Sequence, residues 1–267
     1  MTVREGGESM MRGNVGLTQR MRRIWASRVA VLVAAGVVGL GGIPTFGIRA
    51  SRAGTVTPSG AEGTVPAIQE IDISKRRLVP TGRNRYFILE PGFQAVLEGK
   101  TEKLMITVLD QTKTVAGVVT RVVEEKEWKK GVLVEVSRNF FAMDEHSSDV
   151  FYFGEEVDMY TGGKVTSHAG AWLAGENGAK PGLIMPGQPK LGMRYYQEIA
   201  PGVALDRAEV VSLDYTLETP AGRFTECLRT EEGTPLDPRE REFKTYAPGV
   251  GLIQDADLLL TKYGSVR

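Results

Sequence analysis

The sequence predicts a mainly β domain built on a single antiparallel sheet, strongly curved or barrel-like, with one long Gly/Pro-rich loop. Three observations predict this fold class. Beyond residue 86, short runs rich in Val, Thr, Phe and Tyr often alternate with polar residues, turn residues separate the runs, and none shows a convincing helical stripe. We expect strong curvature or closure, because an open sheet of roughly eight to eleven strands must coil or split.

Residues 1–53 are typical of an N-terminal extension and signal peptide. A basic segment, MRRIWASR, precedes an uncharged apolar run, and small residues follow it, which is the order of a secretory signal. Ser51 and Ala53 suit the positions before a cut, so we expect cleavage before Gly54 and an exported protein, periplasmic or extracellular. If the signal is not cleaved, residues 29–48 form a membrane anchor, and this segment is the only membrane contact that we expect.

Residues 54–85 mix Gly, Pro, Ser, Thr and charges without a period, which is typical of a linker, and we expect the β domain at 86–267. Of 33 basic and 33 acidic residues, residues 1–53 hold eight Arg and two Glu, which leaves 25 basic and 31 acidic residues elsewhere. This acidic excess argues against nucleic-acid binding, which requires clustered basic charge. The single cysteine, Cys227, excludes an intramolecular disulfide and is expected to be a buried structural thiol.

Hairpins are expected to connect the strands of the β domain, because turn residues stand between the β-rich runs. The runs lie at 103–110, 113–128, 131–143, 149–160, 208–219, 222–232, 241–247 and 251–260. The expected turns lie at 110–113, 130–131, 162–163, 220–222 and 248–249.

The segment 168–198 interrupts this pattern because it is dense in Gly and Pro, yet it carries Trp172 and other residues of a buried type. Long loops in compact domains are usually functional lids or disordered, and the apolar residues argue against disorder. We expect either a loop that covers a ligand or an irregular plug that fills one end of the sheet.

The stretch FFAMDEHSSDVFYFGEE, residues 140–156, is predicted to be a hairpin closed by a four-residue loop at 145–148. Asp144 then faces Asp149, and one face of the hairpin becomes almost wholly apolar, which supports this register. The apolar pairs are Ala142 with Phe151, Phe140 with Phe153, Val136 with Val157 and Val134 with Met159.

Two pairs of charged residues stand out in this register. Arg138 faces Glu155 on the apolar face, either as a structural ion pair or as a polar anchor in an otherwise apolar ligand cavity. Asp144 faces Asp149 at the hairpin mouth, where like charges either splay into water or share a cation. Carboxylates and loop carbonyls suit Ca²⁺, so Asp144 and Asp149 are the candidate metal ligands.

Several segments resemble a family of exported bacterial β-rich proteins of unassigned function. They are YFILEPGFQAVLEG, KTVAGVVTRVV, VFYFGEE, GAKPGLIMPGQPKLGMRYYQE, VSLDYTLETPAGRFTECLRTEE and KTYAPGVGLI. The family pattern reads YF-L-PG, then VPAG-F, then YAPGVGL, and the resemblance implies an exported β domain without supplying catalytic residues. The YAPGVGL turn is also distantly similar to curved-sheet envelope proteins of the lipoprotein-carrier type, whose concave apolar face holds acyl chains.

The leading functional hypothesis is a non-catalytic exported protein that binds an apolar or amphipathic small molecule, or an envelope protein, on its concave face. The candidate ligand-binding residues are Arg138, Phe140, Phe151, Phe153, Glu155 and Trp172. Two alternatives remain open. One is a metal-assisted hydrolase that uses the acidic hairpin 144–155, including His146, with 168–198 as its lid. The other is a purely structural envelope component. No catalytic motif occurs in the exported part, so no catalytic residue is assigned.

Overall fold

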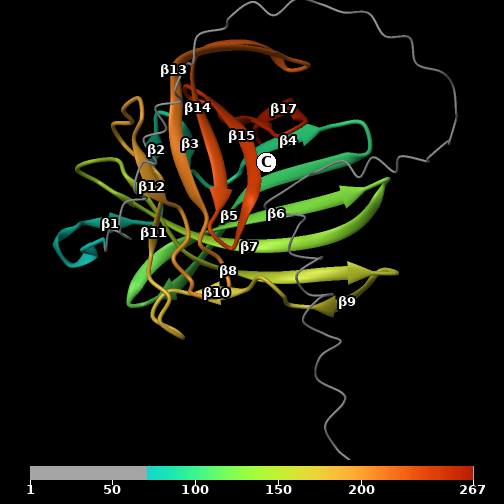
Figure 1. Cartoon of the computed structure of the whole chain (residues 1–267). Coiled ribbons are helices and arrows are strands. Elements are labelled where there is room, and N and C mark those ends of the chain that lie inside the picture. Colours follow the sequence, from blue (N-terminus) through green and yellow to red (C-terminus); the bar gives the residue numbers. More distant parts are fainter. Residues whose placement is uncertain (1–70, 267) are drawn as a thin grey trace, which may run out of the picture. The chain divides into compact units, whose positions relative to one another are not determined.

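The computed structural model describes residues 71–266, which form a mainly β structure (Figure 1). Within this range there is no α-helix, and the single 3₁₀ turn, η1, spans Ile73–Lys75. Accordingly, none of the described segments is a helix long and apolar enough to span a bilayer. The predicted signal, its cleavage site and the first part of the predicted linker lie outside the described residues.

A single antiparallel sheet of 15 strands dominates the described part, and β2 and β3 form a separate two-stranded sheet. In the 15-stranded sheet, the order of hydrogen-bonded neighbours along the main path is β10-β8-β7-β6-β5-β4-β17-β16-β15-β14-β13-β12. Off this path, β1 pairs with β7, and both β9 and β11 pair with β8. The strand bounds are β1 Leu78–Val79, β2 Arg83–Asn84, β3 Phe87–Ile88, β4 Phe93–Glu98, β5 Glu102–Val115, β6 Val118–Lys129, β7 Val132–Asp144, β8 Val150–Thr161, β9 Lys164–Ser167, β10 Trp172–Leu173, β11 Gly182–Met185, β12 Arg194–Tyr196, β13 Arg207–Thr219, β14 Gly222–Thr234, β15 Asp237–Ala247, β16 Gly251–Asp255 and β17 Leu258–Ser265.

Two runs of consecutive hairpins build the sheet, one from β4 to β8 and one from β12 to β17. They are joined where β17 pairs with β4, for example Tyr263 opposite Ala95. In Figure 1, β13, β14 and β15 cross the direction of β5 to β8 steeply. The described strands do not close the sheet into a barrel, because its path ends at β10 on one side and at β12 on the other.

Most of the predicted turns are confirmed, since hairpin turns occur at 130–131, 162–163, 220–221 and 248–250. The predicted turn at 110–113 is wrong. There β5 continues through a register shift between Val108 and Thr112, and the chain reverses instead at Ala116 and Gly117. Both turn residues have positive φ, the conformation that two-residue hairpin turns require.

The segment 168–198 contains β10, β11 and β12, so the expectation of one long Gly/Pro-rich loop is not confirmed. β10 and β11 both pair with β8, and β12 pairs with β13. These short strands also explain why the sheet has more strands than sequence patterning indicates, because two to four residues are too few to show an alternation.

The β7–β8 hairpin has the predicted loop at 145–148, and Asp144 N–H donates to the carbonyl of Asp149 at 2.9 Å. The predicted register holds from there to Phe141 opposite Tyr152, and then a bulge shifts it by one residue. Gly154 lies in this bulge with a φ of 121°. Bulges place an extra residue on one strand, so every partner beyond this point differs from the prediction.

Two clusters of buried apolar side chains form the core. The larger one packs aromatic residues of β7 and β8 against Tyr86, Leu89 and Tyr246, and the smaller one lies around Leu97, Leu104 and Ile253. Cys227 on β14 is buried in the smaller cluster, and burial raises the pKa of its thiol to about 11. The predicted burial of this thiol is therefore confirmed.

We predict that Gly154→Ala lowers the free energy of unfolding by at least about 3 kcal/mol. A Cβ at Gly154 would lie 2.2 Å from the carbonyl oxygen of Trp172 and 2.8 Å from Cα of Leu173. Gly163→Ala is the matched control, because Gly163 also has positive φ but has nothing within 4 Å of its Cβ position. This control should cost about 1 kcal/mol. Urea unfolding measures both, and equal losses would contradict the close approach of β10.

Candidate functional site

The predicted ligand-binding aromatics are buried in the core. Phe140, Phe151 and Phe153 are each at most 1% exposed. The guanidinium of Arg76 lies 4.7 Å from the ring centre of Phe151, and the ammonium of Lys113 lies 4.7 Å from that of Phe140. Phe140 and Phe151 therefore each pack beneath a cation, and all three phenylalanines are buried.

Arg138 and Glu155 do not form the predicted ion pair. The bulge places Glu155 opposite Asn139 and Arg138 opposite Glu156. Because neighbouring residues of a strand point to opposite faces, the two side chains separate. Arg138 instead lies 3.7 Å from Glu124 and 3.3 Å from Asp158, and it is about one third exposed.

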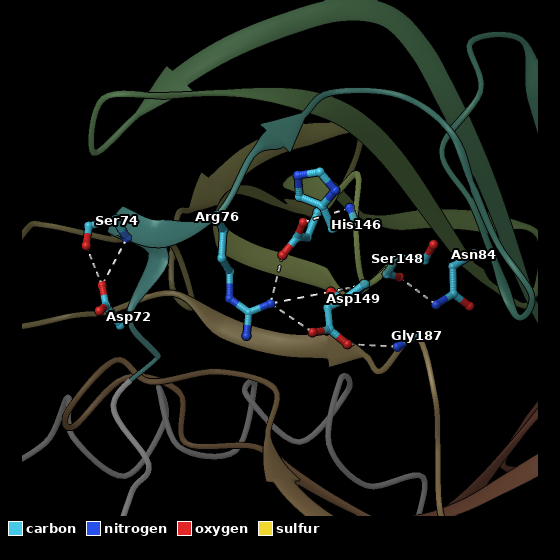
Figure 2. Close-up of polar contacts among 10 residues, drawn as sticks. Asp72, Ser74, Arg76, Asn84, His146, Ser148, Asp149 and Gly187 are labelled. Carbon is cyan, nitrogen blue, oxygen red and sulfur yellow. Dashed lines mark hydrogen bonds and ion pairs between the residues drawn. The ribbon is translucent and has the colours of Figure 1, made fainter.

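Asp144 and Asp149 share a cation that belongs to the protein. Nη1 of Arg76 lies 2.9 Å from a carboxylate oxygen of each residue (Figure 2). Burial alone would raise the pKa of Asp144, but hydrogen bonds from the His146 backbone and from Arg76 outweigh it, so the pKa is lowered. Across residues 71–266, no group of three or more His, Cys, Asp or Glu side chains is arranged to hold a metal ion.

The same network ties the hairpin loop to distant segments. Nδ2 of Asn84 donates to the carbonyls of Ser148, at 2.8 Å, and Pro186, at 3.1 Å. The backbone N–H of Gly187 donates to Oδ1 of Asp149 at 2.8 Å (Figure 2). The loop therefore connects η1 and β2 to the chain that follows β11, which is a structural role.

Strands β3 to β8, β11, β15 and β16 contribute residues to the wall of a cavity of about 110 Å³. Much of its wall is apolar or aromatic, including Phe93, Ile106, Phe141 and Tyr152. The rings of Phe141 and Tyr152 are in contact, with centroids 4.7 Å apart. Phe141 and Tyr152 are the immediate neighbours of the predicted Phe140, Phe151 and Phe153, and Phe140 and Phe151 point to the opposite face of the sheet.

Charged residues form the other part of the cavity wall. They are Glu125 and Glu127 of β6, Glu242 and Lys244 of β15, and Asp255 of β16. Nζ of Lys244 lies 3.4 Å from Glu232 and 3.7 Å from Glu242. Oε1 of Glu232 accepts further hydrogen bonds from Gln197, Thr230 and Tyr246.

Several of these carboxyl groups have raised pKa values. Burial raises the pKa of Glu125 and of Glu242 to about 8, against the opposing effect of Lys244. Burial likewise raises the pKa of Glu135, which faces Glu127 across β6 and β7, to about 7. Such groups hold protons near neutral pH, so the cavity wall offers carboxyl O–H donors as well as carboxylate acceptors.

The structure brings Glu155 and Trp172 together, as opposite residues of β8 and β10. Both line a second pocket of about 200 Å³, and the Trp172 ring meets Tyr152 edge to face at 5.3 Å. Burial, and then the charges of Glu135 and Glu125, raise the pKa of Glu155. Nε1 of Trp172 is buried without a hydrogen-bond partner in the described structure.

Sequence patterning does not predict the charged part of the cavity wall. Glu124, Glu125 and Glu127 lie close together in one charged run, so composition does not show which of them face inward. A register predicted from the β6–β7 turn also gives the wrong cross-strand partners, because the register shifts between Glu127 and Trp128. Strand alternation could have indicated the inward direction, because Glu125 and Glu127 lie on the same face of β6 as Val123, which is buried.

We predict that the free energy of unfolding falls as pH rises from about 5 to about 8. The folded pKa values of Glu125 and Glu242, about 8, exceed their ordinary value of 4.5, so between these values the folded state holds more protons than the unfolded state. Each such carboxyl costs at most about 1.4 kcal/mol per pH unit in that window. Urea unfolding at pH 5, 6, 7 and 8 measures the slope.

Glu125→Gln should flatten this slope, because the amide does not titrate. Glu218→Gln is the control, since Glu218 is exposed on β13 and lies outside the cavity. A wild-type stability that is constant or rises across the window would contradict the raised pKa values.

We also predict that Arg76→Gln lowers the free energy of unfolding by about 1 to 2 kcal/mol, because it leaves two carboxylates facing each other. The control is Arg77→Gln. Arg77 pairs with Glu145 but is largely exposed, so its loss should cost at most about 0.5 kcal/mol. Thermal and urea unfolding measure both variants, and equal losses would show that the Asp144–Asp149 pair does not depend on Arg76.

Comparison with known proteins finds no family model, curated protein or solved structure that matches this chain. Its function is therefore inferred from the cavity and from the groups that line it.

Proposed function

We propose that this protein is a non-catalytic binding protein whose ligand is a small amphipathic molecule held in the cavity inside the sheet. The observation that carries the proposal is the mixed wall of this cavity, apolar and aromatic over most of its surface and charged at Glu125, Glu127, Glu242, Lys244 and Asp255. Binding sites for small molecules commonly combine an apolar lining with a few polar groups that fix orientation.

The apolar wall sets the size of the ligand. A dry protein cavity of about 150 Å³ can bind benzene, so a cavity of about 110 Å³ suits a short alkyl chain or a small ring. Phe93, Phe141 and Tyr152 supply aromatic surface for such a group. Removing apolar surface from water contributes roughly 25 cal/mol per Å², so even a small ligand gains measurable affinity.

The charged wall sets the orientation of the ligand. A polar head beside Glu125, Glu242 and Lys244 would replace hydrogen bonds that the head makes with water, while the apolar part meets the aromatic wall. Among the described residues, the lining includes no serine, cysteine or histidine, and the amine of Lys244 is held by Glu232 and Glu242, so the proposal assigns no catalytic step.

The proposed location is outside the cytoplasm. Its support is the basic and apolar leader of residues 1–53, which lies outside the described residues. A ligand carried through purification would be found by native mass spectrometry or by extraction of protein purified from its own compartment.

We predict that 1-pentanol binds the wild-type protein saturably, at one molecule per chain, and that Phe141→Leu weakens this binding at least about fivefold, by roughly 1 kcal/mol. Phe141 lines the cavity, so a smaller side chain removes part of the apolar wall. Ligand-observed NMR titration measures the dissociation constant.

Phe140→Leu is the matched control. Phe140 is equally buried but does not line the cavity, so this variant should lose stability by a similar amount and keep its affinity for pentanol. Absence of saturable binding to the wild type, or equal weakening in both variants, would count against the cavity as the site.

A further inference from the structure

We propose that the polar head of the ligand is an ammonium group, so that the protein binds small primary amines with Glu125 and Glu242 as their counter-charges. This inference rests on the proposed function, because it concerns the same cavity. It goes further by assigning a charge and a chemical class to the ligand.

The charges that line the cavity carry the inference. Four carboxyl groups and one ammonium group belong to its wall, so acidic groups are in excess there. The ammonium of Lys244 is already engaged, at 3.4 Å from Glu232 and 3.7 Å from Glu242. Glu232 itself lies outside the cavity wall. A carboxylate or phosphate head would oppose ionisation of these acids, whereas a cation favours their ionised forms and balances the charge that they then carry.

Each counter-charge lies among other titratable groups from several strands. Glu125 of β6 is influenced by Lys244 of β15, Asp255 of β16 and Glu135 of β7. Glu242 of β15 is influenced by Lys244, Asp255, Glu232 of β14 and Glu240. Because the acids outnumber the single cation, a second positive charge can be balanced there. Without a ligand, the acids avoid mutual repulsion by staying protonated.

The aromatic wall supports the same ligand class. An amine small enough for the cavity brings its alkyl or aryl part against Phe141 and Tyr152, as the proposed function requires. Aromatic rings also attract cations through their faces, so Tyr86 and Tyr246 in the same wall do not penalise an ammonium group.

Binding of an ammonium group should release protons. Glu125 and Glu242 hold protons below their pKa of about 8, and a bound cation favours their ionised forms. An alkylammonium itself stays protonated to about pH 10.4, so affinity for an amine should rise between pH 6 and pH 8. A neutral alcohol of the same length has no such dependence.

The test compares 1-pentylamine, 1-pentanol and pentanoate with the full-length protein at pH 7 in 150 mM salt. Pentylamine should bind at least about 10-fold tighter than pentanol, which corresponds to one partly desolvated ion pair, and pentanoate should bind more weakly than both. Isothermal titration in two buffers of different ionisation enthalpy should show release of about one proton per bound amine.

Variants locate the effect. Glu125→Gln should reduce the amine affinity about 10-fold and leave the pentanol affinity within about twofold, because an amide has the same shape without the charge. Glu242→Gln is a second variant with the same expectation, should the first not fold. Glu218→Gln, on the exposed side of β13, should change neither affinity.

The outcomes separate the two proposals. If pentanol binds and pentylamine binds no tighter, the ammonium inference is overturned while the proposed function stands. If neither ligand binds saturably, the proposed function fails. If pentylamine binds but Glu125→Gln and Glu242→Gln leave its affinity unchanged, the amine binds elsewhere on the protein and the inference is overturned.

Discussion

The interior of this protein depends on the ammonium group of Lys244. It lies close to Glu232 and Glu242. Burial raises the pKa values of Glu125, Glu198 and Asp206, and the charge of Lys244 limits that rise. These acids come from different hairpins, so a single cation stabilises carboxyl groups that are far apart in the sequence. A buried acid that loses its counter-charge either takes up a proton or destabilises the fold.

Backbone geometry decides which side chains reach this interior. The bulge at Gly154 turns Glu155 from the predicted face to the side of Asn139, and it lets β10 approach closely enough to set Trp172 beside Glu155. The shift near Trp128 similarly pairs Glu127 with Glu135. Two single-residue shifts therefore set the partners of Glu155, Glu127 and Glu135, which strand alternation alone misassigns.

Sequence patterning predicted a mainly β structure with one large antiparallel sheet, most turns, the buried thiol at Cys227 and the loop of the β7–β8 hairpin, because these depend on neighbours within a few residues. It did not predict that Arg76 would neutralise Asp144 and Asp149, since 68 and 73 residues separate them. It also placed the ligand beside the aromatic residues of the hairpin. The cavity is instead lined by Phe141, which is next to Phe140 in the chain, and by residues of β15 and β16. These strands come together only in the complete sheet.

The pairing of β4 with β17 has a kinetic consequence. Within the described residues, the other ladders of the main path join strands close in the chain, whereas this one joins residues 93–98 to residues 259–265. Local hairpins form early, and contacts across such a separation close late because of their entropy cost. Phe141 and Lys244 stand on opposite sides of that junction, so the cavity should come into existence only at the last step of folding.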